Sequence, residues 1–483
     1  MNAIRTAAEP TARRGLSVLQ AVVLILFCLA AYLPGIASLP PTDRDESRFV
    51  QATRQMAETG NYVDIHFQDQ TRYKKPIGIY WLQSAAVALS GDGASAPIWV
   101  YRLVSAAGAT LSVLGTAWLG ARLFGATILS LSAFFRDWRW LKRLRPLPGL
   151  VIVLAIVLPW LAAITIKSGG AFWSQSVGHD LLGKVGGGQE SHGAPPGFYT
   201  LLFPLLVWPF GVFALRAGLA TLGRWRADPR LAFLAAWYLP YWLLIEFVPT
   251  KLPHYVLPAY PAATLALAWA VHEGLALKPL AGGWRIWLER LTLAGSVIAT
   301  LALCGLAIAL PLWLTGHLPA TGIAASVFAI AAGALASARL QVRAQTSVYG
   351  AAACSVVALG LLVTGVLPTI SPLWTSRSLV QAFDEVKPCP GSVLASTGYE
   401  EPSLVFLAGT KTVLTDAAGA ARHLADDPKC AVSAISDDRQ AGFLAALPQG
   451  AASVTALGSV NGLNYSNGRR VHLTLYRMAQ PSG

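Results

Sequence analysis

The residue types best suited to chemistry gather in one polar stretch, from Pro41 to Trp81. Its first part holds three carboxylates and two arginines within six residues, namely Asp43, Arg44, Asp45, Glu46 and Arg48. Its second part holds three cations shortly before the pair Tyr80 and Trp81, namely Arg72, Lys74 and Lys75. A carboxylate can orient or deprotonate a hydroxyl group, and cations can stabilise a phosphate. The stretch therefore predicts an active-site loop for a phosphorylated substrate.

The carboxylates precede a predicted helix. The turn at Pro41 is followed by FVQATRQMAET, a run of good helix formers that ends at Gly60, a residue type common just after a helix. Backbone N–H groups and the helix dipole favour an ionised carboxylate at a helix N-terminus, so Asp45 or Asp43 is expected to be charged at neutral pH. The alternative is that one of them is simply the N-cap.

The composition is that of a polytopic membrane protein. Of 483 residues, 54% are hydrophobic and 13% are charged, whereas soluble domains carry about 25% charged residues. The formal net charge of +13 would also suit a nucleic-acid-binding protein, but the basic residues are dispersed in short clusters between apolar runs. That distribution orients a protein in a membrane, so we expect a membrane and no nucleic acid as partner.

About nine apolar segments are long enough to cross a hydrocarbon core of about 30 Å. They are Leu16–Gly35, Val100–Leu123, Gly149–Lys167, Tyr199–Leu219, Leu231–Val248, Tyr255–His272, Leu291–Leu314, Thr321–Ala338 and Val348–Ile370. The first has no convincing small-residue cleavage site and is interpreted as a retained span. The shorter apolar segment Pro76–Ser90 is expected to be an interfacial helix or, alternatively, a short buried span.

Basic clusters predict the orientation of these spans. Arginines and lysines gather ahead of the first span and in the loops after the second, fourth, sixth and eighth, all on one side of the membrane. By the positive-inside rule this side is cytoplasmic. The polar loop 37–99, the Gly-rich segment Ser168–Gly197, the turn Pro249–His254 and the C-terminal tail then face outward. Cys389 and Cys430 of the tail are expected to pair in an oxidising compartment, or to remain two free thiols.

Two further outward segments hold candidate residues. Lys251, which lies between two prolines just after the fifth span, is expected near the first loop if the spans bundle; alternatively it reaches toward the lipid head groups. In the Gly-rich segment, His179 and His192 could bind a divalent metal with Glu190 or a first-loop carboxylate, although their spacing matches no strong metal motif. No cofactor is predicted with certainty.

The composition changes from Ser371 onward. Short segments that alternate between helical and strand character predict a small outward α/β domain of about 110 residues, the length of one domain. Neither a nucleotide loop nor a catalytic triad is recognisable in it, so binding or positioning is the expected role. The predicted domains are a transmembrane domain, 1–370, with an outward catalytic loop, 37–99, and a soluble periplasmic domain, 371–483.

Several motifs in order resemble the bacterial aminoarabinose transferase-like family of GT-C membrane glycosyltransferases, which are relatives of protein O-mannosyltransferases. They are Asp45–Arg48 (DESR), QATRQMAETGNYV, YKKP with Tyr80 and Trp81, HGAPPGFY at His192–Tyr199, and KLPHYVLP at residues 251–258. The match covers most of the membrane region. It implies an all-α polytopic GT-C fold in a bacterial inner membrane, with the catalytic loop on the periplasmic face.

The resemblance implies transfer of a sugar from a polyprenyl-phosphate donor to a lipid A-like or other envelope acceptor. By position, Asp45 with Glu46 resembles the acidic catalytic group of the family. Arg48, Lys75 and Lys251 would bind the donor phosphate with Tyr255 beside it. If the acceptor is itself a phosphate, Asp45 need not take a proton and instead positions the acceptor and balances charge.

The chain departs from the family pattern in two ways. Family members often carry a glutamate directly before the loop lysine, which is implicated in metal binding with a downstream histidine; here that position is Lys74, so His192 lacks that partner. Several spans that normally follow the motif resembling ARLFG are missing, because Gly125 is followed almost at once by Phe135 and Arg136. An inactive relative that serves as a lipid- or protein-binding scaffold is therefore an alternative, as is a transporter.

Overall fold

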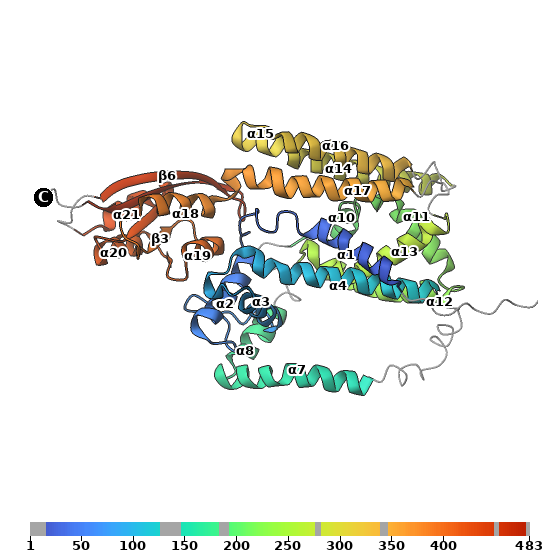
Figure 1. Ribbon diagram of the computed structural model, residues 1–483, viewed down its shortest axis with the longest axis horizontal. Helices are drawn as coiled ribbons and strands as arrows, with labels where there is room; N and C mark the ends of the chain where they lie inside the picture. The colour runs from blue at the N-terminus through green and yellow to red at the C-terminus, as the bar shows by residue number, and fades with distance from the viewer. Residues whose placement is uncertain are drawn as a thin grey trace, which may run out of the picture. The chain divides into compact units, whose positions relative to one another are not determined.

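The computed structural model describes residues 16–125, 146–182, 193–275, 282–338, 346–448 and 454–479, and Figure 1 labels their helices and strands. The chain forms two compact units. The first, which we call the helical unit, comprises Met1–Leu33, Ala106–Leu306 and Ile323–Leu361. The second, which we call the mixed unit, comprises Pro34–Ser105, Ala307–Gly322 and Leu362–Gly483. The mixed unit therefore draws on segments from either side of residue 370, and the domain division at 370/371 stays a prediction.

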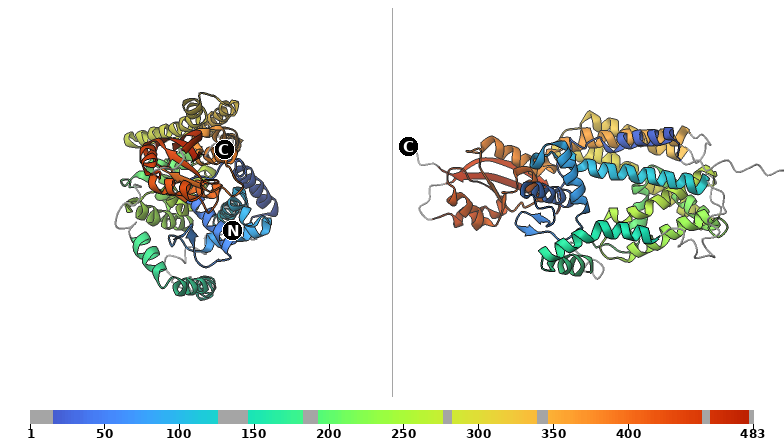
Figure 2. Two further views of the ribbon diagram at one scale, coloured as in Figure 1. Left: turned by 90° about the vertical axis from the view of Figure 1, so that its left-hand side faces the viewer. Right: turned by 60° about the horizontal axis from the view of Figure 1, so that its bottom comes forward.

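The helical unit is built from α-helices joined by short 3-10 and π segments. In chain order these are α1 (Val18–Tyr32), α4 (Ile98–Gly125, which begins in the mixed unit), α7 (Pro146–Lys167), α8 (Ala171–Trp173), the π segment η2 (Ser174–Leu182), α10 (Phe198–Leu206), η3 (Phe210–Phe213), α11 (Ala214–Arg224), α12 (Pro229–Phe247), η4 (Pro253–Ala259), α13 (Tyr260–His272), α14 (Gly283–Cys304), the π segment η5 (Gly305–Ala309, which ends in the mixed unit), α16 (Ala320–Ala338, which begins in the mixed unit) and α17 (Thr346–Leu361). Helix α15 (Leu310–Thr315) belongs to the mixed unit. Helices α14, α16 and α17 lie side by side in Figures 1 and 2.

Five helical segments of the described chain are long and apolar enough to cross a membrane, namely Ile98–Leu123, Leu147–Lys167, Gly283–Thr315, Ala320–Ala338 and Thr346–Thr369. They coincide with five of the predicted spans. Their side chains are mostly not covered by protein: only 11% of the most apolar window of Leu147–Lys167 is buried. Apolar helix faces left open in this way suit contact with lipid tails.

The other four predicted spans are not among these five. Helix α1 has 15 residues, fewer than the roughly 20 that cross a bilayer without help. The segment Tyr199–Leu219 is divided into α10 and α11, because Pro204 and Pro209 each remove a helical hydrogen-bond donor. Proline also lies inside α12 and in η4 just before α13. The total of about nine spans therefore stays a prediction.

The first part of the mixed unit contains the polar loop. Its elements are α2 (Asp45–Thr59), the two-stranded β1 (His66–Phe67) and β2 (Gln70–Thr71), α3 (Gly78–Ser90) and η1 (Gly93–Ser95). The predicted helix end is confirmed: Gly60 has a φ of 69° and its N–H donates to the Met56 carbonyl. The N-cap alternative is wrong, because the N-cap position is Arg44, with a φ of 68° and no side-chain capping bond.

The second part of the mixed unit holds a five-stranded sheet in the order β4-β3-β5-β7-β6. Strand β3 pairs in parallel with β4 and β5, and β7 pairs antiparallel with β5 and β6. The elements are η6 (Leu362–Val366), η7 (Leu367–Thr369), η8 (Ser371–Leu373), α18 (Thr375–Val386), β3 (Leu394–Thr397), α19 (Pro402–Ala408), β4 (Val413–Leu414), α20 (Ala417–Asp426), β5 (Val432–Ser436), α21 (Asp437–Ala446), β6 (Val454–Asn464) and β7 (Arg469–Met478). The predicted mixture of helices and strands is thus present.

Helices cover both faces of this sheet (Figure 2). One core joins Leu379 and Phe383 of α18 and Leu404 of α19 to the sheet. The core on the opposite face joins Leu424 of α20 and Phe443 of α21 to it. A disulfide between Cys389 and Cys430, with a Cα to Cα distance of 5.4 Å, confirms the predicted pair.

Candidate active site

The N-terminus of α2 presents an exposed carboxylate beside a buried cation. The Asp45 side chain is 54% exposed, and its Oδ1 lies 3.7 Å from Nη2 of Arg72, which is only 8% exposed. Arg72 also lies over the Phe49 ring, 5.4 Å from its centroid. Its Nε atom is buried and has no hydrogen-bond partner in the part of the chain that the structure describes. Asp45 can thus reach a substrate and has the positive charge of Arg72 beside it.

The other predicted cations of the loop lie on α2 and in the turn before α3. Arg48 lies one turn after Asp45 on α2, so the two side chains share a face of that helix. Lys75 is half-buried in the turn between β2 and α3, and its neighbour Lys74 is exposed. Sequence analysis assigned Arg72 to the cation cluster but gave it no individual role, because nothing local shows that its side chain is buried against α2.

Glu46 is engaged inside the protein. Its carboxylate accepts hydrogen bonds from Nε and Nη2 of Arg102, at 2.6 and 2.9 Å, and from the N–H and hydroxyl of Thr42, both at 2.7 Å. Burial alone would raise the pKa of Glu46, but the bonds and charge of Arg102 and the bonds of Thr42 outweigh it and lower the pKa below its usual range. Both oxygens are therefore used within the loop.

Arg102 is a residue that sequence analysis missed. Besides Glu46, its guanidinium donates to the carbonyl oxygens of Ile36, Leu39 and Pro40 at 2.7 to 3.0 Å. It thereby fixes the chain that leads into α2. The signal was present in the sequence, since a charge near the start of an apolar span usually serves a purpose.

Asp43 connects the loop to the C-terminal sheet. Its side chain is 9% exposed and accepts a hydrogen bond from the Ser403 hydroxyl, while its N–H donates to the Tyr465 hydroxyl at 2.6 Å. Burial raises the pKa of Asp43 to about 6, against the lowering effect of the Ser403 bond and together with the nearby charge of Glu401. Asp43 is therefore a connecting residue, and Asp45 remains the accessible carboxylate.

In the helical unit, the candidate Lys251 and the nearby Glu246 both bond to helix ends. Nζ of Lys251 donates to the carbonyl oxygens of Ile245, Glu246 and Val248 at 3.1, 2.8 and 2.7 Å, at the C-terminal end of α12. An ammonium group has three donors, so all are used. The Glu246 carboxylate accepts from the N–H groups of Gly197 and Thr200 at 2.9 and 3.0 Å, at the start of α10.

The remaining predicted positions lie in the helical unit or outside the described residues. Tyr255 is half-buried in η4, where its carbonyl oxygen accepts from the Tyr241 hydroxyl at 2.7 Å. His192 and Glu190 lie outside the described residues, as does the junction 126–145 at which the missing spans were inferred. Among the described residues no group of three or more His, Cys, Asp or Glu side chains could hold a metal ion.

An apolar cavity of about 400 Å³ lies in the helical unit. It is lined by α10, α11, α12, α13 and α14, and its wall includes the aromatic side chains of Phe203, Tyr238 and Trp242. Small residues of α13, among them Ala262 and Ala266, leave the space open. A cavity of this kind suits a hydrocarbon chain better than a polar ligand.

Comparison with known proteins gives relatives in sequence and in fold. No family model matches the chain. It is 25% identical over 337 residues to the undecaprenyl phosphate-alpha-4-amino-4-deoxy-L-arabinose arabinosyl transferase of Pseudomonas savastanoi pv. phaseolicola, covering 53% of this chain and 61% of that protein. The corresponding protein of Aeromonas salmonicida is 35% identical over 101 residues, covering 21% and 18%. The chain thus spans about three fifths of the length of the first relative and less of the second.

The solved structures agree in fold. The crystal structure of ArnT from Cupriavidus metallidurans bound to undecaprenyl phosphate superimposes with a TM-score of 0.61 at 16% identity, covering 95% of this chain and 98% of that chain. The apo structure gives a TM-score of 0.55 at 18% identity, with the same coverage. The resemblance predicted from the motifs is confirmed by these matches.

Proposed function

We propose that this membrane protein, similar in sequence and fold to aminoarabinose transferases, is a glycosyltransferase of the bacterial inner membrane. It transfers a sugar from a polyprenyl-phosphate donor to a lipid A-like or other envelope acceptor. The observation that carries the proposal is the exposed Asp45 carboxylate at the start of α2, beside the buried Arg72 and on one helix face with Arg48. This arrangement offers an anion to the acceptor and cations to a leaving phosphate.

In the proposed reaction the bond between the anomeric carbon and the phosphate oxygen breaks, and a bond from that carbon to an acceptor oxygen forms. Polyprenyl phosphate leaves with the bonding electrons, and Arg48, Lys75 and Arg72 stabilise its charge. Asp45 orients the acceptor and takes its proton if the acceptor is a hydroxyl. If the acceptor is already an anionic phosphate, Asp45 only positions it. Tyr255 keeps its proposed role near the donor phosphate.

Glu46 and Lys251 take different roles in this proposal from those expected of them. Each has its polar atoms engaged with internal partners. Contact with a substrate would require one of these bonds to break, and breaking it would leave a buried donor or acceptor unsatisfied. We therefore assign them to positioning: Glu46 holds the chain before α2, and Lys251 holds the end of α12.

Contacts within each unit support the proposed orientation. In the mixed unit, Asp43 of the first loop bonds to Ser403 and Tyr465 of the C-terminal segment. In the helical unit, Gly193 pairs with Thr250 as an isolated β-bridge. Each contact joins two segments expected on the outer face. The proposal therefore keeps the catalytic loop, 37–99, and the C-terminal α/β segment in the periplasm, along with about nine spans.

Turnover by the purified protein tests the function. Radiolabelled polyprenyl-phosphate sugars and a membrane lipid extract are supplied to the protein in nanodiscs, and release of polyprenyl phosphate is measured. We expect Asp45→Asn to lose at least about a hundredfold in rate while it still binds donor. Asp69→Asn is a matched control, because Asp69 is an exposed carboxylate of the same loop. Donor that is bound but never consumed by wild-type protein would favour the scaffold alternative.

The proposed division of labour has its own test. Lys75→Ala is expected to weaken donor binding more than Asp45→Asn does, because the lysine stabilises phosphate in the ground state and the aspartate acts on the acceptor. Donor affinity is measured by competition between labelled and unlabelled donor. Equal losses of affinity in the two variants would contradict the assignment. Adding a chelator to the same assay tests the separate prediction of a metal at His192.

A further inference from the structure

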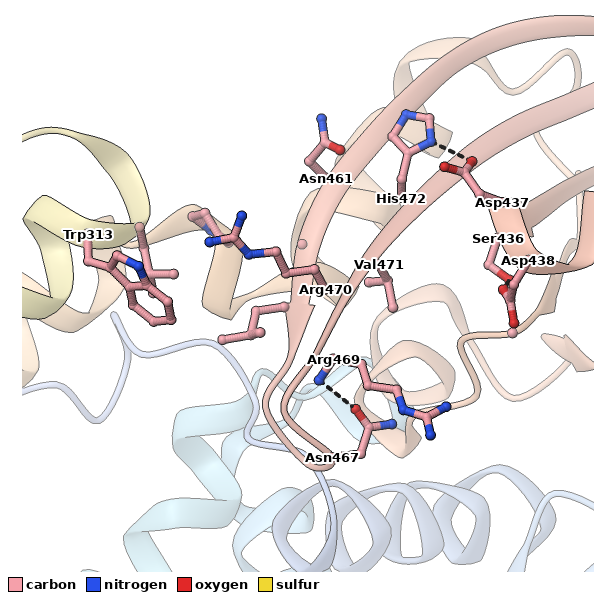
Figure 3. Close-up of a pocket in the computed structure, with 15 residues that line it drawn as sticks. Trp313, Ser436, Asp437, Asp438, Asn461, Asn467, Arg469, Arg470, Val471 and His472 are labelled. Atoms are coloured by element: carbon pink, nitrogen blue, oxygen red, sulfur yellow. Dashed lines mark hydrogen bonds and ion pairs between the residues drawn. The ribbon is translucent and has the colours of Figure 1, made fainter.

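A polar cavity of about 700 Å³ lies beside the C-terminal sheet, apart from the residues assigned to the transfer reaction (Figure 3). Gly398, which directly follows β3, and Ser436, the last residue of β5, line it, together with Asp437 and Asp438 at the start of α21. The hairpin of β6 and β7 forms the opposite wall. Its volume is within the range of small-molecule sites.

The sheet topology accounts for the position of this cavity. After β3 the chain passes through α19 to β4, which lies beside β3 at one edge of the sheet. After β5, the other neighbour of β3, the chain passes through α21 toward β6 and β7 at the opposite edge. The two chain segments therefore leave the carboxyl edge in opposite directions, and a crevice opens between them. Such switch points are the usual ligand sites of open α/β sheets.

Gly398 shows that the crevice depends on a specific backbone. Its φ is 81°, and a Cβ at this position would lie 1.8 Å from the Ser436 hydroxyl oxygen. A side chain would therefore clash with the end of β5 and distort the crevice. The glycine lets the two strand ends approach each other while the space beyond them stays open.

The two carboxylates of the cavity have partners other than its two arginines. The Asp437 carboxylate lies 2.7 Å from the His472 ring, and Asp438 lies 3.5 Å from Arg439 (Figure 3 shows the first pair). Arg469 and Arg470 also line the cavity. Within the described residues neither guanidinium has a hydrogen bond or a carboxylate partner. Two guanidinium groups whose N–H donors are not used by the described residues suit a phosphate, which they can bind through several donors at once.

A tryptophan from a membrane helix completes the wall. Trp313 belongs to α15, near the end of the candidate span Gly283–Thr315, where tryptophans of membrane proteins commonly mark the boundary with water. The residue is 65% exposed, and its ring centroid lies 5.8 Å from the Arg470 guanidinium carbon. An exposed indole next to polar groups suits the apolar C–H face of a sugar ring, because the ring hydroxyls can still reach polar partners such as Asn461.

We propose that this cavity binds a phosphorylated carbohydrate at the membrane surface. Arg469 and Arg470 hold the phosphate, Trp313 packs against the sugar, and Asn461 bonds to its hydroxyl groups. The proposal concerns binding and does not depend on the transferase activity. The same hairpin bonds to the first loop, through Tyr465 to Asp43 and through the Ser466 carbonyl oxygen to Arg44. The hairpin that lines the cavity thus also contacts the residues just before Asp45.

Binding to the full chain in nanodiscs tests the proposal. Calorimetric titrations use glucose 1-phosphate, glucose and inorganic phosphate, and a second set of nanodiscs contains a synthetic diacylated glucosamine 1-phosphate. We expect a sugar phosphate to bind more tightly than glucose or phosphate alone. Arg470→Gln and Arg469→Gln should each weaken binding by about tenfold, since each removes charge-assisted hydrogen bonds. The matched control is Arg422→Gln, an exposed arginine of α20 outside the cavity.

Trp313→Leu provides a second variant that keeps all charges. It should reduce the preference for the sugar phosphate over inorganic phosphate. Selective binding of the lipid probe would identify a lipid head group as the source of the ligand, and equal binding of glucose 1-phosphate would identify a free sugar phosphate. The proposal is overturned if neither probe binds saturably, or if both arginine variants bind as wild type does while their melting temperatures are unchanged.

Discussion

At the scale of single residues, two carboxylates in nearly adjacent positions have opposite environments. Asp43 is buried and bonded to Ser403 and Tyr465, whereas the Asp45 side chain is 54% exposed beside Arg72. The difference arises because Asp43 lies under the C-terminal segment, while Asp45 lies at the open end of α2. We therefore expect Asp45 to take part in the reaction and Asp43 to affect the stability of the fold.

The pKa of Asp43 predicts how stability depends on pH. Burial raises this pKa from 3.8 to about 6 in the folded protein. Between these values the folded state holds a proton that the unfolded state has lost, so stability falls as pH rises through this window. At about 1.4 kcal/mol per pKa unit, the contribution is at most about 3 kcal/mol. Asp43→Asn, which does not titrate, should lose less stability than wild type between pH 4 and pH 7.

Thermal unfolding in detergent at one scan rate measures this difference. Wild type and Asp43→Asn are compared at both pH values, with Asp69→Asn as the control for an exposed carboxylate of the same loop. The interpretation fails if the two proteins lose the same number of degrees over the interval. If Asp43→Asn melts at pH 4 at the same temperature as wild type, the asparagine side chain can replace the protonated aspartate as the hydrogen-bond partner of Ser403.

At the scale of elements, interruptions of the helices create the space in the helical unit. The break between α10 and α11 follows from Pro204 and Pro209, and the apolar cavity lies against these two helices and α12, α13 and α14. A continuous apolar span would pack along its whole length. The interrupted arrangement instead leaves a pocket whose lining suits part of a polyprenyl chain.

Filling this cavity tests its role in donor binding. Ala266→Trp places an indole in the space and should weaken binding of a long polyprenyl-phosphate donor by about tenfold, while a short-chain analogue is affected less. Ala268→Trp is the matched control, because Ala268 is an exposed residue of the same helix outside the cavity. Equal effects of Ala266→Trp on the binding of long and short donors would show that the cavity does not bind the lipid chain.

At the scale of the whole molecule, segments far apart in sequence form common units. Gln51 of α2 donates to the Thr410 hydroxyl at 2.7 Å, and Arg54 lies over the Phe406 ring at 4.2 Å. The first loop and the C-terminal segment therefore belong to one compact unit. They must lie on one side of a membrane, which agrees with the distribution of basic residues in the sequence.

Cysteine labelling measures on which side of the membrane the mixed unit lies. Glu385→Cys in α18 should react with a membrane-impermeant maleimide on spheroplasts, whereas Arg226→Cys after α11 should react only once the membrane is opened. Both positions are exposed in the structure. Wild-type protein gives the background, since Cys389 and Cys430 form a disulfide and the other cysteines lie within helices. Labelling of Arg226→Cys in intact spheroplasts would reverse the proposed orientation.

Features that depend on local chemistry could be predicted from the sequence. Helix α2 ends at Gly60 as predicted, because glycine readily adopts the positive φ that ends a helix. Five long apolar helices coincide with predicted spans, since hydropathy over about 20 residues is a local property. Motif order indicated the family resemblance, and the location of two cysteines in one outward tail indicated the disulfide.

Which charged side chains have internal partners became visible only in the tertiary structure. Glu46 and Lys251 were predicted to contact substrate, yet their atoms bond to Arg102, which lies 56 residues away, and to the carbonyl oxygens at the end of α12. Asp43 is bonded across 360 residues to Ser403. The cavity beside β3 and β5 exists only once the strands have paired. Charges that look equivalent in sequence diverge because burial and pairing depend on contacts between distant segments.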